Sequence, residues 1–208
     1  MPRSQTLLPT PKTVAAVVLA AGSSRRMGDI NKLMLSIEGT PMVLRVVEVL
    51  ERSCVDRILV VTGHEAERIG EALSGRKVEV VHNPDYEEGI GTSIRTGIST
   101  LGKDLDGALI VLADMPWVGT EVVDRLIDAF TEADERSIFV PSFGGKRGNP
   151  TLWSSKHFPE LLELAGDVGG KRLLHRCSEA ISYVQVESTA IGLDVDTPDV
   201  LRELGIGS

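Results

Sequence analysis

The chain has 208 residues, of which 42% are hydrophobic and 25% charged, the composition of an ordinary globular protein. The 22 Lys and Arg residues are outnumbered by 30 Asp and Glu residues, so the net charge is -8. This charge argues against a general nucleic-acid binder, because a phosphate backbone demands surplus positive charge, but it leaves a small phosphorylated ligand open. No apolar stretch reaches the roughly 20 residues that a membrane span requires.

The N-terminal residues 1–13 contain three prolines and no long apolar run, so we expect a flexible tail and no signal peptide. Cys54 and Cys177 lie far apart and form no CxxC pair. Two thiols without a disulfide framework fit a reducing compartment, so the expected location is the cytoplasm.

Near-continuous apolar runs, typical of strands buried on both faces, recur along the chain. They cover residues 14–20, 57–63, 77–83, 107–114, 137–143 and 181–187. Helical patterns separate or follow them at residues 41–53, 64–75, 91–101, 120–135, 157–166, 168–180 and 197–204. Thr120 is the expected N-cap of the fourth of these helices.

Strands that alternate with helices predict an α/β protein. We expect a Rossmann-like three-layer fold with a mostly parallel central sheet, in one domain over residues 14–208. The region from about 137 to 187 reads as a strand, a Gly-rich loop and two helices before the last strand, so it forms a subregion of its own. In open sheets of this kind, ligands bind beyond the carboxyl ends of the strands.

The loop after the first strand is the main candidate for a phosphate site. In "VVLAAGSSRRMGDINK" (17–32), Gly22 permits a sharp turn, and Ser23 and Ser24 add hydroxyl donors. Arg26 and Lys32 can reach phosphate oxygens. The loop lacks both the GxGxxG fingerprint and the GxxxxGK[ST] of a P-loop, which argues against hydride transfer and ATPase chemistry. An ordinary solvated turn remains the alternative.

Carboxylates follow two of the expected strands. Asp114 ends the apolar run "ALIVLAD", and Asp194 and Asp196 stand two apart, so they point to the same side if this piece is extended. Hard carboxylate oxygens suit Mg²⁺, which makes all three candidates for a metal site. Turn or helix capping is the competing interpretation. None of the four histidines has metal-ligand spacing or belongs to a nucleophile motif, so we expect no covalent catalysis.

The loop "LAAGSSRRMGDINK" resembles the signature of the nucleotidyltransferases that modify molybdopterin, and most of all the molybdenum cofactor cytidylyltransferases. The resemblance covers nearly the whole chain. It continues, in order, through "NPDYEEGIGTSIRTGI" (83–98), "ADMPWV" (113–118), "GNPTLW" (148–153), "GDVGGKRLL" (166–174) and "DVDTPD" (194–199). An alanine at Ala21 goes with cytidylyl transfer in this family, whereas guanylyl-transferring relatives usually have glycine there.

The resemblance implies a fold of the nucleotide-diphospho-sugar-transferase type and a Mg²⁺-dependent transfer of CMP from CTP to the phosphate of molybdopterin. Pyrophosphate would be released, and Mn²⁺ is an alternative metal. A guanylyltransferase, or a transferase with another small phosphorylated acceptor, is the competing enzyme. A chaperone that inserts the molybdenum cofactor without catalysis is the non-enzymatic alternative. The expected partners are the small-molecule substrates and a molybdenum hydroxylase of the xanthine dehydrogenase type, with no nucleic acid or membrane.

The matching motifs imply which residues of this sequence correspond to the family's site residues. The resemblance implies catalytic roles for Arg26, Lys32 and Asp114, and a metal site at Asp114, Asp194 and Asp196. The nucleotide would contact Leu19, Ala20, Ala21, Gly22, Ser23, Ser24, Arg26, Lys32, Gly89, Gly91 and Ser93. The acceptor, held by the 137–187 subregion, would contact Asn149, Asp167 and Lys171.

Overall fold

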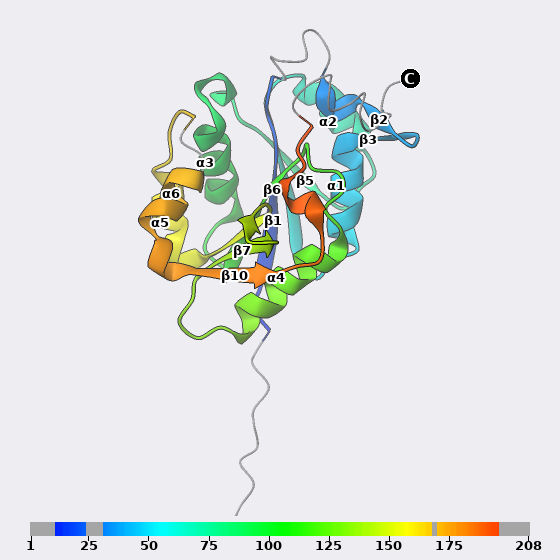
Figure 1. Ribbon diagram of the computed structural model, residues 1–208. Helices are drawn as coiled ribbons and strands as arrows, with labels where there is room; N and C mark the ends of the chain where they lie inside the picture. Colours follow the sequence, from blue (N-terminus) through cyan, green and yellow to red (C-terminus); the bar gives the residue numbers. More distant parts are fainter. Residues whose placement is uncertain (1–10, 24–30, 168–169, 196–208) are drawn as a thin grey trace, which may run out of the picture.

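The structure is a computed structural model that describes residues 11–23, 31–167 and 170–195. Its main sheet has eight strands (Figure 1). The order across the sheet is β10 (Ile181–Gln185), β7 (Ile138–Phe143), β9 (Thr151–Ser154), β6 (Gly107–Leu112), β1 (Val14–Ala20), β4 (Arg57–Thr62) and β5 (Glu79–His82). The eighth strand, β8 (Lys146–Arg147), pairs with β7.

The sheet is mostly parallel, as the sequence predicts. The pairs of β1 with β4 and β6, of β4 with β5 and of β7 with β10 are parallel. Only β9, against β6 and β7, and β8, against β7, run antiparallel among the pairs of the main sheet in the described residues. The carboxyl ends of β1, β4 and β6 therefore meet at one edge, where a ligand site is expected.

Strand β1 shows how the apolar runs build the layers. Its side chains alternate between two hydrophobic clusters, one containing Val14, Ala16 and Val18, the other Ala15 and Val17. A strand buried on both faces needs apolar residues at every position, which explains why "VAAVVLA" lacks the alternation of a half-exposed strand.

Helices cover both faces of the sheet, which confirms the three-layer fold. Apolar residues of α1 (Met42–Glu51), α2 (Ala66–Ala72) and α4 (Thr120–Glu132) belong to the first cluster. Those of α3 (Ile90–Leu101), α5 (Phe158–Leu162) and α6 (Gly170–Arg176) belong to the second. Figure 1 shows α3, α5 and α6 on one side of the sheet and α1 on the other.

Short elements complete the described structure. A separate two-stranded sheet joins β2 (Ser36–Ile37) and β3 (Thr40–Pro41). The 3-10 helices are η2 (Lys32–Met34), η3 (Tyr86–Glu88), η4 (Ser155–His157), η5 (Ser178–Ala180) and η6 (Thr189–Gly192). None of the helices in the described ranges is long and apolar enough to cross a membrane.

All six predicted strands are confirmed within a few residues, but some details of the sequence prediction are wrong. Helix α4 has Gly119 at its N-cap, and Thr120 is its first residue, whose hydroxyl donates to the carbonyl of Val49 at 3.5 Å instead of capping the helix. The prediction also missed the short strands β2, β3 and β8, and it missed β9, which inserts between β6 and β7. The predicted helix at 197–204 lies outside the described residues.

The segment before β1 is fastened to the body at two residues. Lys12 Nζ donates to the carbonyls of Phe130 (2.6 Å) and Ala133 (3.1 Å) at the end of α4. The backbone N–H of Thr13 donates to Asp106 Oδ2 at 2.8 Å. A cation at a helix C-terminus is favourable, because the last carbonyls carry partial negative charge.

Candidate active site

The first loop leaves the sheet where the sequence predicts a phosphate site. Leu19 and Ala20 end β1, and Ala21 is buried, with its carbonyl accepting the N–H of His64 at 3.2 Å. Gly22 is exposed, and a Cβ built there would have no neighbour within 4 Å. Its backbone therefore borders open space at the sheet edge, and Ser23 is half-buried beside it. Ser24 and Arg26 lie outside the described residues, so their roles stay predictions.

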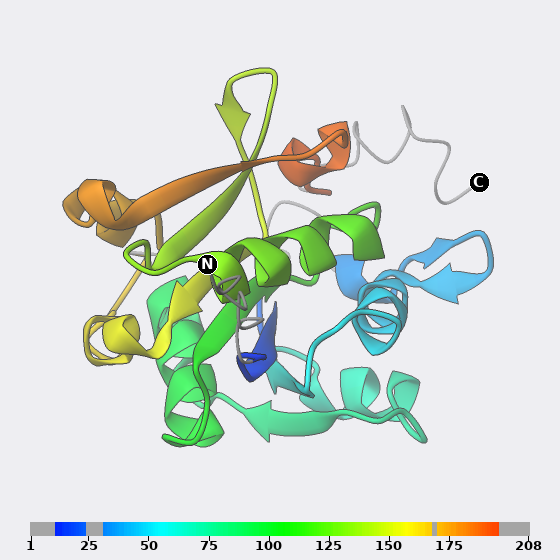
Figure 2. The same cartoon turned by 90° about the horizontal axis from the view of Figure 1, so that it is seen from below.

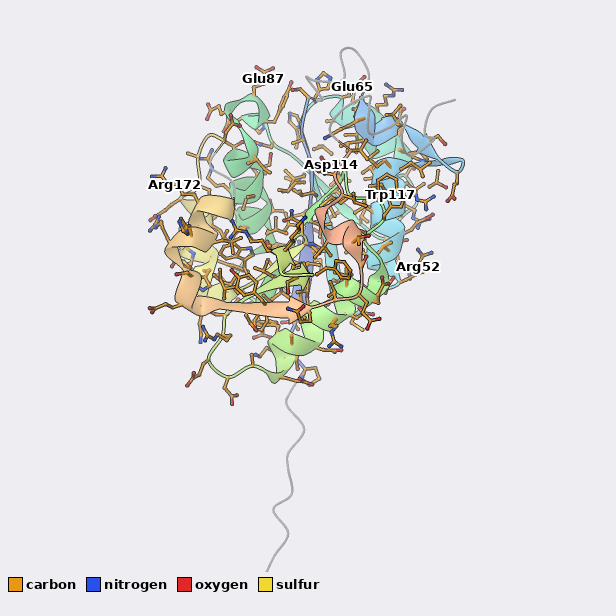
Figure 3. The ribbon with its side chains drawn as sticks, viewed as in Figure 1. Arg52, Glu65, Glu87, Asp114, Trp117 and Arg172 are labelled. Atoms are coloured by element: carbon orange, nitrogen blue, oxygen red, sulfur yellow. The ribbon has the colours of Figure 1, made fainter. Side chains whose placement is uncertain are left out.

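Lys32 and Asp114 form the central ion pair of the site. Lys32 Nζ lies 2.7 Å from Asp114 Oδ2, across 82 residues of sequence. Both side chains are mostly buried, with exposed fractions of 14% and 18%. Ala113 comes directly after β6, and Asp114 is the next residue. The N–H of Ala113 donates to the Leu19 carbonyl at 3.3 Å. The structure thus brings two predicted catalytic residues together. Figure 3 shows where Asp114 lies in the molecule.

The second oxygen of Asp114 has a different environment. Asp114 Oδ1 is buried and accepts no hydrogen bond from any described residue. A buried carboxylate oxygen without a partner is costly, so such groups are normally paired or coordinate a cation. The donor set of a carboxylate at the mouth of a sheet fits Mg²⁺ or Mn²⁺.

Asp194 comes close to Asp114 through the backbone. The N–H of Val195 donates to the Asp114 carbonyl at 3.1 Å, so the 194–195 segment lies against the end of β6. Asp194 is exposed there, and Asp196 lies outside the described residues. Within the described ranges, no group of three His, Cys, Asp or Glu side chains is arranged to hold a metal ion. Asp114 and Asp194 therefore lie near each other in the chain fold, but the described residues do not form a complete set of metal ligands around them.

A pocket of about 360 Å³ opens beside this edge. Asn149, the predicted acceptor residue, and Asp194 contribute to its polar wall. Its full lining is Leu112, Met115, Arg147, Gly148, Asn149, Thr151, Leu174, Ile191, Gly192 and Asp194. The mix of apolar side chains with a few polar groups is typical of small-molecule sites.

The predicted nucleotide segment at the start of α3 is fixed by a buried asparagine that sequence reasoning missed. Asn83 is 1% exposed, and its Nδ2 donates to Thr92 Oγ1 (2.9 Å) and Ser93 Oγ (3.0 Å). Its Oδ1 accepts the N–H of Asp85 at 3.1 Å. Ser93, predicted to contact nucleotide, is thus itself buried and held by Asn83. The Asn-Pro pair at 83–84, which resembles the family motif, was the available signal.

Gly89 and Gly91 approach the protein's own chain. The N–H of Gly91 donates to the carbonyl of Gly166 at 2.9 Å, and Gly89 has a φ of 121°. A Cβ on Gly89 would come within 2.5 Å of Asp167 N. The two glycines therefore let α3 begin against the loop that carries the exposed Asp167. Lys171 lies in α6, and the structure does not describe its side chain.

Asn31 is a second positioning residue that the sequence reasoning did not single out. It is buried, and its Oδ1 accepts the N–H of Leu33 at 3.0 Å, which caps the short helix that carries Lys32. The nearby Asn31 side chain, and after it Arg68, whose Nη1 lies 3.3 Å from Glu65 Oε1, holds the pKa of Glu65 below its ordinary value. Glu65 lies at the same end of the molecule as Asp114 (Figure 3).

One histidine forms contacts that sequence reasoning did not anticipate. His157 Nε2 lies 2.9 Å from Ser137 Oγ, and Nδ1 lies 3.7 Å from Glu160 Oε1. Ser137 is buried and precedes β7, at the amino end of that strand and away from Asp114. The Trp153 ring packs edge-on against His157. These contacts tie β7, β9 and α5 together.

This fold, with a Lys–carboxylate pair and a small-molecule pocket at the carboxyl edge of the sheet, is that of a nucleotidyltransferase. It is the nucleotide-diphospho-sugar-transferase type of mostly parallel α/β sheet. The family model of the MobA-like NTP transferase domain matches residues 16–181. The chain therefore belongs to the MobA-like NTP transferase family.

Individual relatives agree with this assignment. Purine catabolism protein PucB of Bacillus subtilis is 34% identical over 192 residues, covering 88% of this chain and 91% of PucB. Bifunctional protein GlmU of Symbiobacterium thermophilum is 34% identical over 123 residues, covering 58% of this chain. That match covers 26% of GlmU, so the chain corresponds to about a quarter of the GlmU length.

Among solved structures, Rv0371c of Mycobacterium tuberculosis H37Rv superposes with a TM-score of 0.84 at 29% identity, covering 94% of this chain and 98% of Rv0371c. A second Rv0371c structure is a complex with manganese. It has a TM-score of 0.79 at 26% identity and covers 92% of this chain and 97% of Rv0371c. A relative of the same fold thus binds a divalent cation of the kind that Asp114 suits.

Proposed function

We propose that the protein transfers CMP from CTP to the phosphate of molybdopterin, releasing pyrophosphate and forming the cytosine dinucleotide of the cofactor. The observation that supports this most is the contact of Lys32 Nζ with Asp114 Oδ2 at 2.7 Å, beside an Asp114 Oδ1 that has no hydrogen bond within the described structure. The pair offers a cation and a metal ligand side by side, which is what a triphosphate and its metal need.

The backbone at the end of β1 receives the triphosphate in this proposal. Residues 21–24 supply N–H groups, and Lys32 with Arg26 neutralises the charge of the departing pyrophosphate. Asp114 would hold Mg²⁺, with Asp194 and Asp196 as further candidate ligands. When bound there, Mg²⁺ would supply positive charge to the α-phosphate and to the leaving group.

The acceptor occupies the pocket beside Met115, with Asn149 on its wall. An oxygen of the acceptor phosphate attacks the α-phosphorus of CTP, and the bond from that phosphorus to the β-phosphate oxygen breaks. One phosphoanhydride forms and one is lost, so no oxidant or reductant takes part. Positioning and charge stabilisation suffice for such a transfer, so the chain needs no nucleophilic side chain.

Two features support the choice of substrates. Ala21 is the residue that the resemblance associates with cytidine. PucB is named for purine catabolism, which agrees with a molybdenum hydroxylase of the xanthine dehydrogenase type as the recipient of the product. The manganese complex of Rv0371c supports a divalent cation, and Mn²⁺ should replace Mg²⁺.

The test is an assay of pyrophosphate release with CTP, Mg²⁺ and molybdopterin, in which mass spectrometry identifies the product. We expect molybdopterin to gain one CMP, and GTP to be a poorer donor. Asp114→Asn should lower the rate at least ~100-fold, the scale for losing a preorganised charge-stabilising group. Asp104→Asn, at an exposed residue of the loop after α3, is the matched control and should leave the rate unchanged.

Other outcomes would select the alternatives. A GMP adduct would identify a guanylyltransferase, and transfer to another phosphorylated compound would change the acceptor. Tight binding of the cofactor without any release of pyrophosphate would favour the insertion chaperone. Full activity of Asp114→Asn would contradict the role of the ion pair.

A further inference from the structure

A tight hairpin carries Arg147, a basic residue that lines the pocket. Strands β7 and β8 are joined by Gly144 and Gly145, whose φ angles of 56° and 79° are both positive. Two-residue turns with positive φ at both positions match the twist of the flanking strands and strongly favour glycine. The hairpin stands out from the body of the molecule (Figure 2). The Gly-rich stretch that follows β7 is thus a defined turn.

The register of the hairpin sends its two basic residues to different faces. Ser142 pairs with Arg147, and Phe143 pairs with Lys146. Directly opposite residues share a face of a sheet, and successive residues alternate. Arg147 therefore lies on the face of the buried Ser142 and lines the pocket, whereas Lys146 lies on the face of the exposed Phe143 and does not.

Hydrogen bonds fix the backbone on the C-terminal side of Arg147. The N–H of Gly148 donates to the carbonyl of Pro141, and the N–H of Asn149 donates to the carbonyl of Ile191, both at 2.9 Å. A Cβ on Gly148 would lie 2.1 Å from the Ile191 carbonyl oxygen, so only glycine fits at this contact. Arg147 is therefore carried by a fixed backbone at the pocket wall, which reduces the entropic cost of using it.

The charge of Arg147 is not neutralised by the described part of the chain. Its side chain makes no ion pair or hydrogen bond with any residue in the described ranges, although the protein has a net charge of -8. Arg147 is exposed, and it lines the pocket together with the apolar Leu112, Met115 and Ile191. An unpaired arginine beside apolar walls suits a ligand with a ring system and a phosphate, because guanidinium binds phosphate through two parallel hydrogen bonds.

We propose that Arg147 binds the phosphate monoester of the acceptor and selects for it. This inference rests on the proposed function, in which that phosphate is the attacking group. In this proposal the two basic residues bind different substrates. Lys32 binds the nucleotide phosphates beside Asp114, and Arg147 binds the attacking phosphate of the acceptor in the neighbouring pocket. Arg147 is a binding residue that sets acceptor specificity, and neither its charge nor its position was singled out by the sequence motifs.

Kinetics of Arg147→Ala, Arg147→Lys and the matched control Lys146→Ala test the inference. Arg147→Ala should raise the KM for the acceptor roughly 10- to 100-fold, the range for losing a charge-assisted hydrogen-bonding pair, while the KM for CTP changes less than about twofold. Arg147→Lys should recover part of the loss, since it keeps the charge without the fork. Lys146→Ala should behave as the wild type, because its side chain lies on the other face.

Equilibrium binding without turnover separates this inference from the proposed function. The probes are a phosphorylated pterin, the same pterin without phosphate, and a sugar 1-phosphate. A wild-type preference for the phosphorylated member that disappears in Arg147→Ala supports the inference, even if the sugar phosphate binds best and the proposed acceptor is wrong. Equal binding of all monoesters by wild type and Arg147→Ala, or binding of none by the wild type, would overturn it.

Discussion

The two oxygens of Asp114 have different surroundings, and this decides what the residue can do. Oδ2 meets the Lys32 ammonium at 2.7 Å, while Oδ1 is buried without a hydrogen bond among the described residues. A neighbouring positive charge offsets the charge of the carboxylate and repels a metal cation. Lys32 therefore weakens metal binding to the resting protein, although it helps to neutralise a triphosphate once the nucleotide is bound.

Lys32→Gln should separate these two effects. Removing the ammonium beside Asp114 should tighten Mn²⁺ binding about 10-fold in the absence of nucleotide, because a repulsive charge in contact with the ligand is lost. The same change should lower CMP transfer about 100-fold. Electron paramagnetic resonance of free Mn²⁺ measures the first quantity and pyrophosphate release the second. The exposed Lys103, changed to Gln, is the control. An unchanged Mn²⁺ affinity would place the cation away from Asp114.

Helix α3 lies on the central strands through a glycine that would otherwise weaken it. Gly97 is buried, and a Cβ built on it would lie 2.4 Å from Val17 Cγ1 and 3.2 Å from Val61 Cγ2. Both valines are buried in β1 and β4, and a β-branched side chain in a packed strand has little freedom to move. Gly97 thus sets how closely α3 approaches the sheet.

Gly97→Ala and Gly70→Ala should therefore change the free energy of unfolding in opposite directions. Alanine at Gly97 should lower the free energy of unfolding by about 1–3 kcal/mol through overpacking, although alanine is the better helix former. At Gly70, inside α2, the added methyl meets no atom within 4 Å, so alanine should raise it by up to about 1 kcal/mol. Urea denaturation of both variants measures the difference. A stabilised Gly97→Ala protein would show that α3 can retreat from the sheet.

The sequence predicts elements best where a pattern is long and self-contained. Residues 14–20 match β1 because a seven-residue apolar run carries the signal by itself. The four residues of β9 give no such signal, and they form a strand only because β6 and β7 leave a place between them. The site follows the same rule: Lys32 and Asp114 are recognisable singly, but their contact across 82 residues depends on the assembled sheet.

At the scale of the whole molecule, the segments assigned to the two substrates touch each other. Gly91, in the predicted nucleotide segment, donates its N–H to Gly166, next to the predicted acceptor residue Asp167, at 2.9 Å. Gly89 has a φ of 121°, and a Cβ there would lie 2.4 Å from the carbonyl carbon of Gly166. Any side chain at Gly89 must therefore push the loop at Gly166 away from the start of α3. The position of one substrate segment thus depends on the other.

Gly89→Ala should impair the use of both substrates, unlike the acceptor-specific change at Arg147. We expect kcat/KM for CTP and for the acceptor to fall together, roughly 10- to 100-fold, because displacements near 1 Å are enough for such losses. Gly102→Ala is the control: its φ of 79° imposes backbone strain on alanine, but the added Cβ meets nothing within 4 Å. It should be destabilised by about 1–2 kcal/mol while its kcat/KM values stay near those of the wild type. Steady-state kinetics with each substrate varied in turn, together with thermal unfolding, would distinguish displacement from strain. A contact that couples the two segments must change the kcat/KM for both substrates. If Gly89→Ala lowered the kcat/KM for only one of them, the contact between Gly91 and Gly166 would be local packing without an effect on the other substrate.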